Sequence, residues 1–210
     1  MLSVTSQTYA ARHRAQSGFT LIEVMISAVI LAIGVLGVVS VLAMSKVYQH
    51  ESIQRVRAVE LADGIFERIR RNPSGVTGYD TGLDAPLGNG STGNEPQPNC
   101  SATSCDADEL ASHDLWDWER LLDGAASTVT EEGVAVPTLA LRNVRACIDF
   151  TADAGRDNTG IVDVVIQWQG VRETSDAVDA SGVVCGDAGD EDATWRQLIV
   201  SSYVVDETEL

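Results

Sequence analysis

A single carboxylate, that of Glu23, lies at the start of a long apolar stretch and is the first side chain whose chemistry needs an explanation. The chain carries no charged residue from Val24 to Ser45. As a helix this stretch would be about 33 Å long, enough to cross the hydrocarbon core of a bilayer. A carboxylate at its edge either stays protonated or pairs with a cation. Because the stretch supplies no lysine or arginine, the nearest candidate for that cation is an amino terminus.

Four cysteines are the other residues that could form covalent or metal-binding sites. In an exported domain they would form two disulfides, for which three connectivities exist. We prefer Cys100 with Cys105, which are close in sequence, and Cys147 with Cys185, which would tie a predicted strand to the loop of residues 170–194. The spacing argues against zinc, because no paired C-x-x-C motif is present and the histidines lie far from the second pair. We therefore expect no metal.

Two acidic turns, residues 153–160 and 187–192, offer oxygen ligands of the kind that calcium binds. Neither has the twelve-residue loop with a closing glutamate, so we interpret both as ordinary turns. The histidines, His13, His50 and His113, lie in separate parts of the chain, and the sequence pairs none of them with a nucleophile. There is no phosphate-binding glycine loop either. We therefore expect that the protein is not an enzyme and uses no cofactor.

The chain is strongly acidic, with 31 aspartates and glutamates against 14 lysines and arginines and a net charge of −17. Such a charge repels phosphate backbones, so we expect no direct contact with nucleic acid. The length of 210 residues leaves room for one globular domain beside a membrane helix.

The residues before the apolar stretch set the orientation of the predicted membrane helix. Arg12 and Arg14 place the N-terminus in the cytoplasm by the positive-inside rule, and everything beyond about residue 46 outside the inner membrane. An ordinary secretory signal is cut after its apolar region, next to small residues, whereas here the small residue Gly18 precedes that region. Cleavage at Gly18 would leave the membrane helix on the mature, exported chain.

From Gly18 to Glu23 the sequence reads Gly-Phe-Thr-Leu-Ile-Glu, which resembles the class III signal of type IV prepilins and type II secretion pseudopilins. The resemblance implies a leader at residues 1–18, which prepilin peptidase, a membrane aspartyl enzyme, removes between Gly18 and Phe19. It also implies N-methylation of Phe19, a change that preserves the charge of the amine. That amine is then the expected cation for Glu23, within one helix or between neighbouring subunits of a filament.

Behind the leader we predict one long helix from Phe19 to Asn72. Residues 19–45 would be its membrane-spanning, assembly part, and residues 46–72 an amphipathic part packed on a globular head. In the second part apolar side chains recur at three- and four-residue steps, which predicts a stripe against a core: Ile53, Val56, Val59, Ala62, Phe66 and Ile69. The helix should end at Asn72 because Pro73 follows.

The head, residues 73–210, is expected to complete an α+β pilin fold. Residues 73–105 are rich in turn-forming residues and predict a long, mobile connection. Asp106 and Glu109 form a capping-box pattern that starts a short helix, which Gly124 ends. The β-branched, alternating segments that follow predict an antiparallel sheet packed against the stripe: Val144–Phe150, Ile161–Trp168, Gln197–Val205 and a short Val134–Val136.

The head also resembles one subgroup of minor pilins, the pilus modification proteins of the PilV type. In that subgroup a similar helix with aspartates and tryptophans follows a cysteine-containing loop, and here residues 114–118 read Asp-Leu-Trp-Asp-Trp. We expect this segment to anchor the short helix to the head. Major pilins usually carry a proline partway along the first helix, whereas residues 19–72 contain none, which favours a minor subunit.

The resemblance implies a minor pilin subunit that takes part in priming, assembly or modification of the type IV pilus. Its partners would be prepilin peptidase, other minor pilins, the major pilin, the membrane and the inner-membrane assembly platform. It would lie in the inner membrane as a single-pass protein with a cytoplasmic N-terminus and a periplasmic head, and in the pilus at the cell surface after assembly. Two alternatives stay open: a type II secretion pseudopilin, and a tip adhesin or other binding module.

Overall fold

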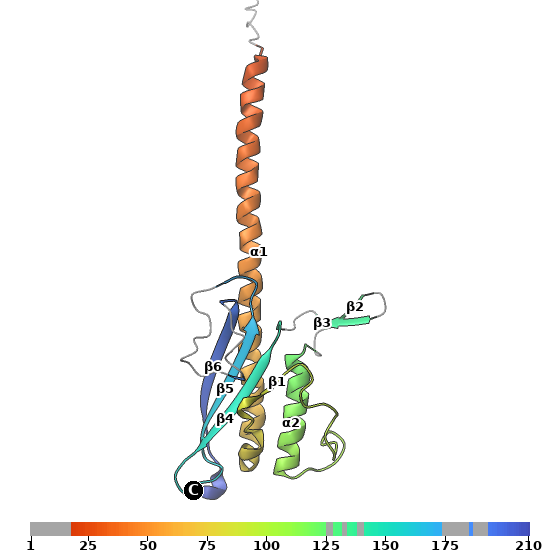
Figure 1. The fold of residues 1–210 in the computed structure, drawn as a ribbon, viewed down its shortest axis with the longest axis vertical. Coiled ribbons are helices and arrows are strands. Elements are labelled where there is room, and N and C mark those ends of the chain that lie inside the picture. The colour runs from red at the N-terminus through yellow and green to blue at the C-terminus, as the bar shows by residue number, and fades with distance from the viewer. Residues whose placement is uncertain (1–17, 125–127, 132–133, 138–140, 174–184, 187–192) are drawn as a thin grey trace, which may run out of the picture. The chain divides into compact units, whose positions relative to one another are not determined.

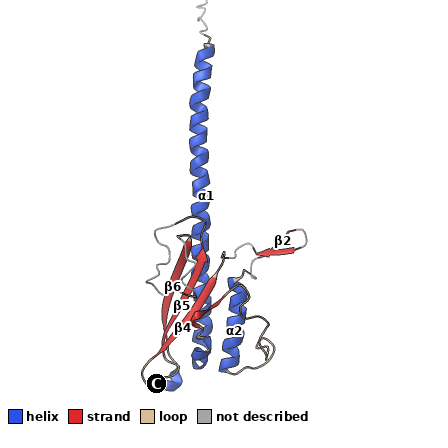
Figure 2. Cartoon of the chain, viewed as in Figure 1, coloured by secondary structure: helices blue, strands red, loops and turns tan. Residues whose placement is uncertain are grey.

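The computed structural model describes residues 18–124, 128–131, 134–137, 141–173, 185–186 and 193–210 (Figure 1). The contacts divide the chain into two compact units, Met1–Lys46 and Val47–Leu210, and helix α1 contributes residues to both. The described residues of the first unit form helix only, whereas the second unit combines helices with strands, as the predicted α+β class requires (Figure 2).

Helix α1 runs from Leu21 to Arg71, close to the predicted range. It ends there because Pro73 cannot donate a backbone hydrogen bond and disfavours the helical conformation at Asn72. By length and composition, α1 is long and apolar enough to cross a membrane, and the apolar window that qualifies it is uncovered by the rest of the described chain. Its two parts therefore have different surroundings.

Within the second unit, one face of α1 is buried against the head. The buried residues recur at helical spacing: Gln54, Ala58, Leu61, Ala62, Ile65, Phe66 and Ile69. The predicted stripe is thus right in its C-terminal half and wrong at Ile53, Val56 and Val59, which are 53%, 56% and 40% exposed. Successive side chains are about 100° apart around a helix, so Ile53 and Val56 lie on the side away from Ala58. Apolar spacing alone cannot decide which of two faces packs inward.

A four-stranded antiparallel sheet in the order β1-β4-β5-β6 forms the frame of the head (Figure 1). Its strands are β1 (Gly82–Leu87), β4 (Arg145–Ala152), β5 (Gly160–Gln169) and β6 (Trp195–Val204). The register places Val164 opposite Ile148 on one side and Val200 on the other. These side chains and the buried face of α1 belong to one core, which confirms the predicted packing of helix on sheet.

Three of the four predicted strands coincide with β4, β5 and β6 to within two residues. The fourth, Val134–Val136, lies in β3 (Val134–Pro137), which pairs not with the main sheet but with β2 (Thr128–Glu131) in a separate hairpin. Neither β1 nor β2 was predicted.

The short helix α2 (Ala107–Leu122) begins with the predicted capping box. The carboxylate of Asp106 accepts from the backbone N–H of Glu109 at 2.8 Å, and the carboxylate of Glu109 accepts from the N–H of Asp106 at 3.0 Å. Gly124 has a φ of +85°, the conformation in which glycine ends helices at least cost. Both predicted ends of this helix are therefore confirmed.

The connection of residues 73–105 is more ordered than predicted. It contains the 3-10 helix η1 (Pro73–Tyr79) as well as β1, and the ring of Tyr79 is fully buried. A Cβ atom at Gly75 would lie 2.5 Å from the carbonyl oxygen of Ala107, so η1 approaches α2 more closely than a side chain would allow. The predicted long, mobile connection thus contains regular elements, because glycines and prolines, which indicate turns, here permit close packing. A second 3-10 helix, η3 (Glu207–Glu209), closes the chain.

Candidate processing and assembly site

The residues of the predicted processing site immediately precede α1. Gly18, Phe19 and Thr20 are not helical, and the helix begins at Leu21. The carbonyl oxygen of Thr20 accepts the backbone N–H of Glu23 at 3.1 Å, which closes the first turn. Glu23 therefore lies at the positive end of the helix dipole, where a negative charge is favoured.

The carboxylate of Glu23 has no ion pair or hydrogen bond with the residues that the structure describes. Ser27 donates its hydroxyl to the backbone carbonyl of Glu23 at 2.7 Å, which leaves the carboxylate free. Phe19 is 83% exposed. The leader residues with Arg12 and Arg14 lie outside the described residues, so cleavage and methylation at Phe19 stay predictions. The arrangement leaves an acid available to a cation from outside this part of the chain.

The apolar side chains that follow Glu23 are uncovered throughout the first unit. From Val24 to Met44 the large apolar side chains are between 47% and 70% exposed. Single exposed apolar residues are common on proteins, but a continuous apolar surface along a helix of this length marks contact with a membrane or with other proteins. The surface and the unpaired acid lie on the same helix.

In the head, a partly buried charge network centred on Arg68 fixes α2 to α1. The guanidinium of Arg68 donates to Oδ1 of Asp114 at 2.8 Å and also to Oδ2 of Asp117. The hydroxyl of Tyr79 donates to the other oxygen of Asp114 at 2.7 Å. Burial alone would lower the pKa of Arg68, but its hydrogen bonds to the aspartates raise it. Burial and the bond to Asp114 raise the pKa of Tyr79 well above its usual value. Near neutral pH the network therefore keeps Arg68 charged and Tyr79 neutral.

The two tryptophans of residues 114–118 attach α2 on either side. Trp118 is 1% exposed, and its indole N–H donates to the carbonyl oxygen of Leu61 in α1 at 2.9 Å. Trp116 donates to the carbonyl oxygen of Gly93 at 3.3 Å. The expected anchoring role of this segment is present in the structure, and its two aspartates take part in it through their bonds to Arg68.

Glu119 holds the loop after β1, a role that was not predicted. This side chain is 2% exposed, and its carboxylate accepts the backbone N–H groups of Gly88, Ser91 and Thr92 at 2.6–2.8 Å as well as the hydroxyls of Ser91 and Thr92. Burial would raise the pKa of Glu119, but these hydrogen bonds lower it below its usual value. One feature of the sequence could have indicated this role. Glu119 directly follows Trp118 and lies on the buried face of α2, where apolar residues are the rule.

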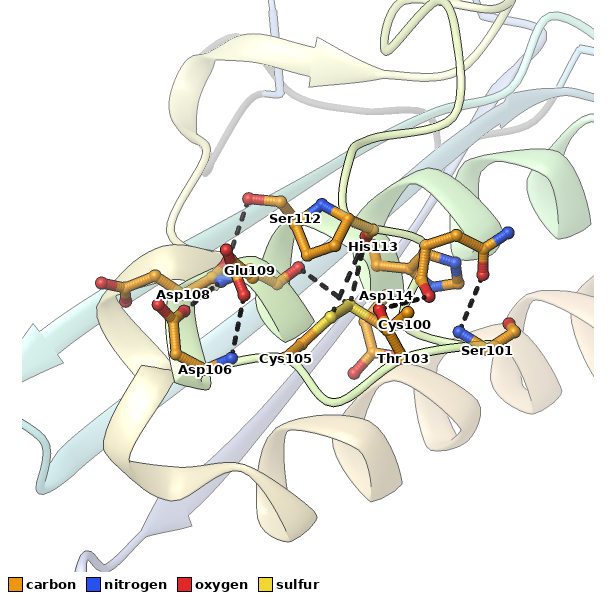
Figure 3. Close-up of a disulfide and its surroundings, with 12 residues drawn as sticks. Cys100, Ser101, Thr103, Cys105, Asp106, Asp108, Glu109, Ser112, His113 and Asp114 are labelled. Carbon is orange, nitrogen blue, oxygen red and sulfur yellow. Dashed lines mark hydrogen bonds between the residues drawn. A yellow bond between two sulfur atoms is a disulfide. The ribbon is translucent and has the colours of Figure 1, made fainter.

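The disulfide Cys100–Cys105 lies against the first turns of α2 (Figure 3). The two Cα atoms are 5.6 Å apart, and Sγ of Cys100 is 3.7 Å from the carbonyl oxygen of Glu109. His113 is only 7% exposed, and its Nε2 lies 3.4 Å from a carboxylate oxygen of Glu95. The loop that carries this disulfide thus covers the histidine.

The disulfide Cys147–Cys185 joins β4 to a residue of the long segment between β5 and β6. Both cysteines are fully buried and pack with Val165 of β5. The neighbouring Gly186 donates its N–H to the carbonyl oxygen of Leu83 in β1 at 2.7 Å. These two disulfides are the pairs that were preferred from the sequence.

The acidic turn of residues 153–160 is tied to the end of the chain. One carboxylate oxygen of Glu209 accepts the backbone N–H groups of Asp157 and Asn158, both at 2.8 Å. The second acidic turn, residues 187–192, lies outside the described residues. Over the residues that are described, no group of three or more histidines, cysteines, aspartates or glutamates is arranged to hold a metal ion.

Two family models match the chain. The prokaryotic N-terminal methylation motif matches residues 13–39, which include the segment from Gly18 to Glu23. The Tt1218-like model, described as type IV pilin Tt1218, matches residues 41–116, from the middle of α1 to past the middle of α2. Together these two matches support a type IV pilin or its prepilin. No curated protein and no solved structure matches the chain.

The two matches bear directly on the N-terminal residues. The domains of pilins are structural subunits, and the methylation motif implies processing of the prepilin by prepilin peptidase and assembly with other pilins in a membrane-associated pilus. The apolar part of α1 agrees with membrane anchoring of the prepilin.

Proposed function

We propose that this prepilin is a minor pilin of the pilus modification type, which takes part in priming, assembly or modification of the type IV pilus. One observation carries the proposal. The match to the methylation motif covers the start of α1, where the carboxylate of Glu23 and the apolar side chains that follow it contact no other part of the described chain. The resemblance of residues 114–118 to the PilV type, and the lack of a proline in residues 19–72, support a minor rather than a major subunit.

The chemistry begins with removal of the leader. Hydrolysis of the Gly18–Phe19 peptide bond creates a new amine on Phe19, and methylation keeps its positive charge. In a staggered bundle of helices this amine pairs with Glu23 of a neighbouring subunit. An unpaired charge in hydrocarbon is costly, so a subunit in the wrong register would lose this pair and be disfavoured.

Packing of neighbouring helices then replaces contacts with lipid. At Gly34 and Gly37 an added Cβ atom would have no other residue within 4 Å, and the glycines themselves carry no side chain. Another helix can therefore approach α1 closely at these two positions. The partners under this proposal are the major pilin, other minor pilins and the inner-membrane assembly platform. The head is periplasmic before assembly and reaches the cell surface with the pilus.

Mass spectrometry on sheared filaments tests the proposal. We expect a chain that begins with N-methylated Phe19, present at a small fraction of the major subunit. An intact Met1 terminus, found only in membranes without filaments, would contradict it. Deletion of the gene separates the pilus from a type II secretion system: loss of surface pili supports the proposal, whereas exoproteins trapped in the periplasm with pili intact would assign the chain to secretion.

A further inference from the structure

The last residues of the chain meet the turn that joins β4 to β5 at one end of the sheet (Figure 1). The backbone N–H of Asp206 donates to the hydroxyl oxygen of Thr159 at 3.0 Å, and one oxygen of Glu209 accepts two N–H groups of the same turn. The N–H of Glu209 donates to the carbonyl oxygen of Asp206, also at 3.0 Å, so a single tight turn separates the two acids. Side chains three residues apart in such a turn lie on the same side of it.

The two carboxylates each have one oxygen atom that lacks a partner. Asp206 is 2% exposed, and its Oδ1 accepts the N–H and the hydroxyl of Thr208 at 3.0 and 2.8 Å. Its Oδ2 is enclosed and makes no hydrogen bond with the residues that the structure describes, and the same holds for Oε2 of Glu209. Buried polar atoms in proteins are nearly always paired. Two unpaired acceptor atoms on neighbouring carboxylates therefore point to a partner that is not part of the described chain.

The same two carboxylates have no positive partner. Within the described chain no lysine or arginine forms an ion pair with either of them, and this includes Arg156 of the adjoining turn. The N–H and hydroxyl of Thr208 lower the pKa of Asp206. Burial would raise the pKa of Glu209, but the hydrogen-bond donors of residues 157–159 lower it. Both acids are therefore ionised near neutral pH, an unfavourable arrangement unless a cation lies between them.

We propose that Oδ2 of Asp206 and Oε2 of Glu209 bind a calcium ion, which fastens the end of the chain to the turn between β4 and β5. A cation satisfies acceptor oxygens directly, and calcium takes about six to eight oxygen ligands from carboxylates, carbonyl groups and water. Ser74 and Asn158 lie beside the carboxylate of Asp206 and offer neutral oxygens for the same ion. Magnesium loses its water reluctantly, so enclosed oxygens favour calcium.

This site reverses the interpretation of residues 153–160 as an ordinary turn. The turn lacks the closing glutamate of a calcium loop, and here the carboxylates come instead from the end of the chain. Two acids are fewer than a group of three or more metal-binding side chains, so neutral oxygens must complete the site. With only two carboxylates we expect weak binding, with a dissociation constant of about 10⁻⁴–10⁻³ M, as in extracellular calcium-binding modules.

Calcium titration of the full chain in micelles, after removal of metals with EDTA, tests the site. Calorimetry should find one ion per chain, and the thermal unfolding temperature should rise with calcium but not with the same concentration of magnesium. Asp206→Asn and Glu209→Gln remove one negative charge each and keep the shape and an accepting oxygen, so each should weaken calcium binding at least tenfold. The matched control is Glu207→Gln, an exposed acid of the same turn, which should bind calcium like the wild type.

The same variants without calcium distinguish binding from a purely structural role. In EDTA, Asp206→Asn and Glu209→Gln should unfold at the wild-type temperature or above it, because each relieves the repulsion between the two acids. No binding in about 10 mM calcium, ten times the weakest expected dissociation constant, would overturn the inference. Equal binding by the wild type and both variants, or equal stabilisation by magnesium, would also overturn it. These measurements need no filament, so their outcome is independent of the proposed function.

Discussion

Nη1 of Arg68 in α1 and Oδ1 of Asp114 in α2 are 2.8 Å apart, although the two residues are separated by 46 positions in sequence. Tyr79 of η1 binds the second oxygen of the same carboxylate, so three elements meet on Asp114. The side chain of Asp114 is 12% exposed. These contacts fix the position of α2 against α1 although the connection of residues 73–105 between them is rich in turns.

Arg68→Met should lower the free energy of unfolding by about 3 kcal/mol, because it leaves two partly buried aspartates without their cation. Urea unfolding of the full chain in micelles, followed by tryptophan fluorescence, measures the loss. Arg57→Met removes an arginine from the same helix whose partner, Glu60, is exposed, and should change the value by less than about 1 kcal/mol. Equal losses in the two variants would refute a special role for the Arg68 network.

Glu119 should make stability depend on acid pH. Because hydrogen bonding lowers its pKa in the folded state below the ordinary 4.5, its contribution is complete above that pH and is lost as the pH falls through the folded-state pKa. Glu119→Gln should destabilise the head by about 2 kcal/mol at pH 7, and by less at pH 3. Thermal unfolding across this range is the measurement, with Glu67→Gln, an exposed residue of α1, as the control. A constant difference at all pH values would be inconsistent with this account.

The two disulfides should differ in their effect on stability. Cys147–Cys185 closes a loop with a sequence separation of 38, and Cys100–Cys105 one of 5. In the chain-entropy description the longer loop stabilises by about 2 kcal/mol more. Paired cysteine-to-alanine variants, compared by urea unfolding, give the difference directly. A larger loss from the Cys100–Cys105 pair would mean that its packing against α2 outweighs loop entropy.

Glu23→Ala should leave membrane insertion unchanged and remove the subunit from filaments, since the new amine of Phe19 would have no acid to pair with. Carbonate extraction of membranes measures insertion, and immunoblots of sheared pili measure assembly. Glu60→Ala on the exposed side of the same helix is the control and should assemble normally. Normal amounts of the Glu23 variant in pili would rule out the proposed pair.

The sequence predicted those elements whose signals are local. The capping box needs only Asp106 and Glu109, and the end of α1 needs only Asn72 before Pro73. Strand β5 is recognisable because most of its residues are β-branched and apolar. Strand β1, from Gly82 to Leu87, contains a glycine and a proline and pairs with β4 in a shifted register, so no alternation indicates it.

The candidate site divides in the same way. The segment from Gly18 to Glu23 is contiguous and could be interpreted from its residue types alone. Glu119, in contrast, binds mainly backbone N–H groups about 30 positions away, and backbone groups are the same for every residue.

The bond between Glu209 and the turn of residues 153–160 has a practical consequence for imaging. Glu209 is next to the last residue, and its carboxylate holds the backbone of Asp157 and Asn158. A fluorescent protein fused after Leu210 would place a bulky, moving load on this bond, and through it on the turn that joins β4 to β5. Microscopy of the labelled subunit would then report on a loosened head rather than the native one, so a reporter attached elsewhere on the exposed surface is the sounder choice.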